Sequence, residues 1–70
     1  MDTIRFFQLL ETVERWWMWR IYEYDDLFTT LLHKSTEQYP DANTAETDCW
    51  RFIDLNGIKD IQNDRPNQST

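Results

Sequence analysis

The sequence of 70 residues has very few of the residues that build reactive sites: one glycine, one cysteine, one histidine and two prolines. A lone cysteine excludes an intramolecular disulfide, and one histidine beside it does not make a recognisable set of zinc ligands. The sequence also lacks a glycine-rich phosphate loop and a nucleophile paired with a base. We therefore predict a protein that is not an enzyme and that has no cofactor and no metal site.

Long apolar runs and basic residues are also scarce. No run approaches the roughly 20 apolar residues that span a bilayer, and Asp2 places an acid where a secretory signal needs basic residues. Thirteen Asp and Glu against seven Lys and Arg give a net charge of −6, which repels phosphate backbones and anionic membranes. Together with the unpaired thiol, these features predict a cytoplasmic protein that binds neither a membrane nor nucleic acid directly.

Large apolar residues are abundant in the first half of the chain, and their spacing predicts a long helix. Steps of three and four keep side chains on one helical face. We predict an all-α fold whose amphipathic N-terminal helix runs from about residue 3 to 34, a length of about 48 Å at 1.5 Å per residue. The apolar positions on this face are Phe6, Leu10, Val13, Trp17, Ile21, Tyr24, Phe28 and Leu31.

The ends of this predicted helix carry the expected signals. Thr3 or the preceding acid suits the N-cap, and Pro40 prevents continuation at the other end. A break near Asp25 or Asp26 is the alternative, because either acid could cap a second helical segment.

A short second element follows a polar connection. Asn43 and Glu46 resemble a capping box, and apolar residues repeat at helical spacing up to Ile53. Gly57 then stands where a helix ends, with Asn56 as its C-cap in a Schellman motif. The competing interpretation is a hairpin with its turn at these two residues, but its strands would have no consistently apolar face.

From Asn63 onward the sequence contains no apolar side chain that could pack against a core. We predict a single small helical domain over residues 1–62 and a disordered C-terminal tail over residues 63–70.

Several side chains fall outside the apolar stripe of the predicted first helix. Met18, Trp19 and Tyr22 lie on its charged face, where they make either a contact site for a partner or the part of a small core that the second helix covers. Arg20 points into the apolar sector. It either reaches water along its stem or pairs with a carboxylate, from Asp48, from Asp54 or from another chain.

A chain of this length cannot bury so much aromatic surface against itself. We expect association, most economically as a homodimer in which two long helices pack antiparallel. A structural accessory subunit of a larger complex, or a self-assembling dimer, is the alternative function.

The favoured function is a small acidic protein that binds another macromolecule through its aromatic helix, as an inhibitor or adaptor. The partner is a protein, and we expect it to present a basic surface. A virus-encoded inhibitor of host defence, with carboxylates that imitate nucleic-acid charge, is a narrower version of this hypothesis. The predicted partner-binding residues are Trp16, Trp17, Met18, Trp19, Tyr22, Glu23, Asp25 and Asp26.

Overall fold

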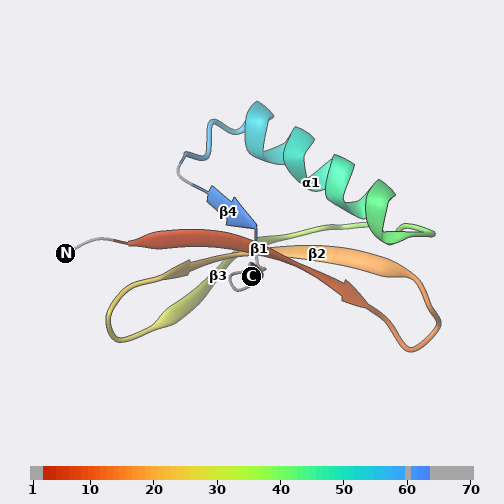
Figure 1. Ribbon diagram of the computed structural model, residues 1–70, viewed down its shortest axis with the longest axis horizontal. Helices are drawn as coiled ribbons and strands as arrows, with labels where there is room; N and C mark the ends of the chain where they lie inside the picture. Colours follow the sequence, from red (N-terminus) through yellow and green to blue (C-terminus); the bar gives the residue numbers. More distant parts are fainter. Residues whose placement is uncertain (1–2, 60, 64–70) are drawn as a thin grey trace, which may run out of the picture.

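The computed structural model describes residues 3–59 and 61–63, which form one sheet and one helix (Figure 1). The sheet has the order β3-β2-β1-β4, with β1, β2 and β3 antiparallel and the short β4 parallel to β1. The elements are β1 (Ile4–Glu11), β2 (Trp17–Tyr24), β3 (Thr29–Lys34), α1 (Ala42–Leu55) and β4 (Ile61–Asn63).

The prediction of an all-α protein with a long N-terminal helix is wrong. Residues 4–34 form a three-stranded antiparallel meander, in which Phe7 pairs with Ile21 and Leu9 with Trp19. The segment is rich in aromatic and β-branched residues and contains no alanine between Ile4 and Leu32, a composition that suits pleated strands better than a helix.

Two tight connections replace the predicted helical continuity. The β1–β2 loop is closed by the Thr12 amide, which donates to the Trp16 carbonyl at 2.7 Å, and Arg15 turns it with a φ of 70°. At the β2–β3 turn, Asp25 Oδ1 accepts hydrogen bonds from the amides of Leu27 and Phe28, each at 2.8 Å. The chain does turn at Asp25, but between two strands, so the prediction that Asp25 or Asp26 caps a second helical segment is wrong.

The second helix is confirmed. Asp41, rather than Asn43, is its N-cap and accepts a hydrogen bond from the Thr44 amide at 2.7 Å. At the other end Asn56 is the C-cap and Gly57 has a φ of 64°. The Ile58 amide donates to the Ile53 carbonyl at 3.1 Å, which completes the predicted Schellman motif and excludes the hairpin.

The core lies between α1 and one face of the sheet. Ala45, Cys49 and Ile53 recur every fourth residue on the inner side of the helix and are at most 5% exposed. From the sheet they meet Phe7, Trp19 and Ile21, of which the most exposed is Trp19 at 2%. Cys49 is thus the small core residue that its spacing indicates.

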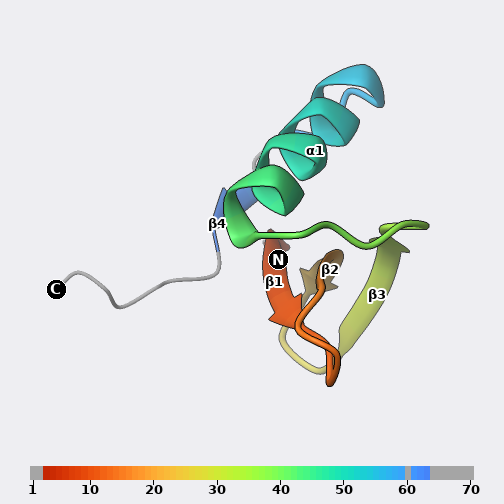
Figure 2. The same ribbon diagram turned by 90° about the vertical axis from the view of Figure 1, so that its right-hand side faces the viewer.

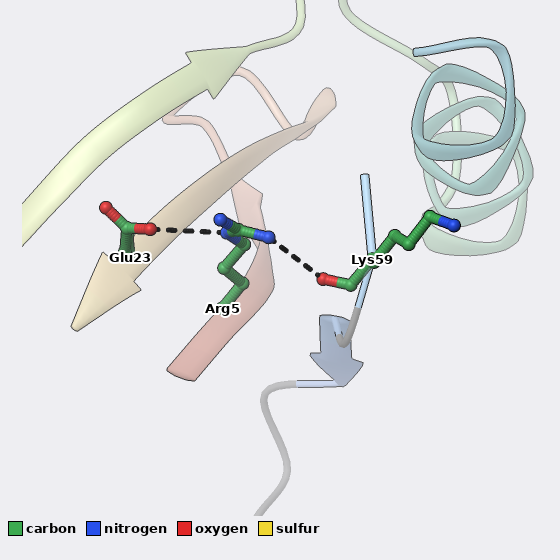
Figure 3. Close-up of polar contacts among 3 residues, drawn as sticks. All are labelled: Arg5, Glu23 and Lys59. Atoms are coloured by element: carbon green, nitrogen blue, oxygen red, sulfur yellow. Dashed lines mark hydrogen bonds and ion pairs between the residues drawn. The ribbon is translucent and has the colours of Figure 1, made fainter. Parts of the chain in front are cut away.

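Arg5 ties the short fourth strand to the meander, as Figure 3 shows. Its Nε donates to Glu23 Oε2 on β2 at 3.3 Å, and its Nη1 donates to the carbonyl of Lys59, shortly before β4, at 3.2 Å. The predicted tail beyond β4, residues 64–70, lies outside the described residues, and Asn63 belongs to β4.

Substitution of two adjacent phenylalanines of β1 tests which face of the sheet packs in the core. Phe7 is 1% exposed beneath α1, whereas Phe6 lies on the other face. Phe7→Ala should therefore lower the free energy of unfolding by about 3–5 kcal/mol. Phe6→Ala should cost clearly less, because no described element covers its side chain.

Urea unfolding followed by tryptophan fluorescence measures both values. A helix over residues 3–34 would instead place Phe6 on its apolar stripe, so a larger loss for Phe6→Ala than for Phe7→Ala would contradict the assignment of the faces.

Candidate interaction surface

The helix covers one face of the sheet, and no described residue covers the other (Figure 2). Strand register identifies the side chains of this uncovered face, because alternate residues point to opposite sides. The face is continuous across β1, β2 and β3. We call it the open face, and its residues are Ile4, Phe6, Gln8, Leu10, Met18, Arg20, Tyr22, Tyr24, Thr29, Leu31 and Lys34.

The open face is mainly apolar and aromatic. Phe6 and Tyr22 stack at its middle with their ring centroids 5.3 Å apart. Ile4, Tyr24 and Leu31 surround this pair and are between 42% and 47% exposed. Large apolar side chains that a small protein leaves in water at one place mark a contact surface more often than a chance exposure.

A row of polar side chains crosses the middle of the open face. Gln8 of β1 is the register partner of Arg20 on β2, and Arg20 is the register partner of Lys34 on β3. Leu10 and Met18 lie on one side of this polar row, and the aromatic residues lie on the other. The surface therefore combines apolar area with two positive charges.

Of the predicted partner-binding residues, the structure brings Met18 and Tyr22 together on the open face. Trp19 is separated from them, because it is a core residue on the opposite face. The neighbouring Trp17 is also on the helix side of the sheet, and its backbone pairs with Tyr39 in an isolated bridge. Trp16 lies in the β1–β2 loop and is 43% exposed.

None of the three predicted acidic contacts is a side chain of the open face, although Asp25 and Asp26 lie in the turn at one end of it. Glu23 points to the helix side and pairs with Arg5. Asp25 accepts the turn amides, and these hydrogen bonds hold the pKa of its carboxyl below the usual value. Asp26 is exposed in the same turn. The structure therefore places these three acids beside the open face or on the helix side of the sheet, and not among the aromatic residues of the open face.

For other residues of the open face, the spacing predicts a place on the apolar helical stripe that is buried in a homodimer, outside the predicted partner-binding residues. Phe6, Leu10, Tyr24 and Leu31 are the examples. Strand alternation places these side chains on the open face. In β1 this alternation is hard to see in the sequence, because adjacent residues on opposite faces are both apolar.

A second cluster that could carry chemistry joins the sheet to the helix. Asp48 Oδ2 accepts hydrogen bonds from Trp19 Nε1 at 3.1 Å and from the Tyr39 hydroxyl at 2.5 Å. The indole of Trp19 and the hydroxyl of Tyr39 both donate to this one carboxylate oxygen. None of the three side chains is a nucleophile held beside a base. This cluster therefore holds the residue 35–41 connection against the core.

The described residues contain no group of His, Cys, Asp and Glu that could hold a metal ion. The helix α1, the one helix among these residues, is not long and apolar enough to cross a membrane. No protein-family model matches the chain, and no curated protein or solved structure shows significant similarity to it.

The cluster of Asp48 predicts how stability depends on alkaline pH. Burial, and then the hydrogen bond to Asp48, raises the pKa of Tyr39 from 10.0 to about 12. Burial likewise raises the pKa of Cys49 from 9.0 to about 12. The folded state thus holds both protons more tightly than the unfolded state, so stability is complete below about pH 9 and falls as the pH rises towards 12.

Urea unfolding at a series of pH values measures this fall. Tyr39→Phe should be less stable at neutral pH and should lose less stability between pH 10 and 12 than the native chain, since it has no phenol to ionise. An unchanged slope in that range would show that Tyr39 does not keep its proton in the folded state.

Proposed function

We propose that this protein is a non-enzymatic binding module that acts as an inhibitor or adaptor, and that a protein partner packs on its open face. The observation that carries the proposal is the exposure of an apolar and aromatic sheet face, which the one helix among residues 3–59 and 61–63 leaves uncovered. Interfaces concentrate aromatic side chains and Met in this way.

The charge distribution supports a selective contact rather than general adhesion. Acidic side chains lie in the loops at both ends of the open face, including Glu14 in the β1–β2 loop and Asp26 in the β2–β3 turn. Such a rim favours partners whose contact surface has a basic periphery, and it repels nucleic acid and surfaces with an acidic periphery. With a single buried cysteine and no disulfide to form, the cytoplasm is the compartment that we propose.

A matched pair of leucine substitutions tests the proposal. Leu10 lies on the open face, whereas Leu55 is 77% exposed at the end of α1. The immobilised native chain and each variant are exposed to lysate of the cells that contain the protein. The amount of partner retained by Leu10→Ser should be roughly tenfold lower than that retained by the native chain, because the partner no longer buries this leucine side chain. Leu55→Ser should retain as much as the native chain.

Equal retention by Leu10→Ser and the native chain would contradict binding through the open face. A structural role through self-assembly makes a different prediction: light scattering would then show a dimer of the native chain, and Leu10→Ser would dissociate it without any foreign protein.

A further inference from the structure

The polar row on the open face has an unusual arrangement of charge. Gln8, Arg20 and Lys34 occupy three neighbouring strands at one level of the sheet. Strands are about 4.8 Å apart, so the row extends about 10 Å across the middle of an apolar surface. Arg20 is at its centre, on the central strand of the meander.

The positive groups of this row are poorly satisfied within the described residues. Arg20 Nε is shielded from water and has no hydrogen-bond partner, and Arg20 Nη1 reaches the Tyr22 hydroxyl only at 3.5 Å. Lys34, directly across from Arg20, has the same charge, and like charges at paired strand positions destabilise a sheet. The arrangement therefore costs stability in the free protein.

No acid among the described residues compensates these charges on the open face. The chain carries almost two acids for each base, yet every described position of this face is apolar, neutral or basic. Asp48, a predicted partner for Arg20, is on the other side of the sheet, where it binds Trp19 and Tyr39. Within the described part of the chain, Arg20 therefore has no carboxylate partner.

We propose that the polar row receives carboxylates of the protein partner, and that apolar side chains beside these carboxylates pack on the two apolar halves of the open face. Arg20 donates charge-assisted hydrogen bonds from the terminal nitrogens of its guanidinium, and Lys34 and Gln8 supply further donors along the row. This inference rests on the proposed function and names the chemistry of the partner.

A second copy of the chain fits this surface less well than a foreign protein. Packing two open faces about a central two-fold axis would place Arg20 of each copy near the other, with no carboxylate between them. Single-stranded nucleic acid also fits poorly, since the net charge is −6 and Phe6 and Tyr22 already stack on each other instead of leaving both rings free.

Short peptides can serve as the test ligand. One is a blocked peptide with two aspartates between leucines, and its control has asparagine at both positions, which keeps the shape and removes the charge. Each is titrated into the full chain and followed by NMR signals of Arg20 Nε–H and the Met18 methyl group. The aspartate peptide should shift both signals saturably and bind roughly tenfold tighter than the control.

Variants separate the polar row from general charge attraction. Arg20→Met keeps most of the apolar stem and should reduce the affinity for the aspartate peptide to that of the asparagine peptide. Arg51→Met removes a positive charge from α1, outside the open face, and should leave the affinity unchanged. Arg20→Met should also raise the midpoint of thermal unfolding by about 2–5 °C, because it removes a like-charge pair and an unsatisfied donor.

Several outcomes would overturn the inference: equal binding of the two peptides, shifts that map outside the open face, no saturable shift, or tighter binding of a thymidine decanucleotide. A dimer that forms through this face would overturn it as well. If a captured partner depends on Leu10 but not on Arg20, the proposed function stands and this inference fails. If it depends on neither residue, both fail.

Discussion

The packing of α1 against one side of the sheet is the contact on which the rest of the structure depends. The helix is about 21 Å long at 1.5 Å per residue, and it presents Ala45, Cys49 and Ile53 to the sheet. Two of these are small, so the helix lies close enough for Phe7 and Trp19 to fill the space between the layers. Fixing this one face also fixes the register of every strand, because a shift by one residue would expose the core.

The same contact defines the open face. The described residues contain one helix, and it covers one side of the sheet, so no described element covers the second side. Its apolar side chains shield one another only in part, and its charges lie where the free protein gains little from them. Stability therefore comes mainly from the helix side, and substitutions on the open face should affect the fold less than substitutions in the core.

The second half of the structure could be predicted from the sequence, because its signals are local. Gly57 takes the left-handed conformation that glycine adopts most readily, and the spacing of Ala45, Cys49 and Ile53 has one helical interpretation. The first half could not be predicted this way. Phe6 and Phe7, like Leu9 and Leu10, place apolar side chains on both faces, which hides the alternation of a strand and imitates a broad helical stripe.

The turns of the meander were equally hard to identify. The β1–β2 loop contains no glycine, proline or asparagine, and Arg15 takes the left-handed conformation instead. Arg20 shows what the sequence could and could not reveal about the site. Its unusual position among apolar residues was visible from spacing, but its neighbours Gln8 and Lys34 come from strand pairing, which only the structure gives.

Solvent exposure of individual methyl groups tests the central claim, that the helix covers one face of this sheet and leaves the other free. A soluble paramagnetic probe added to the methyl-labelled protein reports this exposure at each position. The structure predicts strong broadening of the Met18 and Leu10 methyl signals and little broadening of Ile21 and Ile53, at micromolar and at submillimolar concentration. Equal protection of all four residues would show that the open face is covered, and would contradict the account.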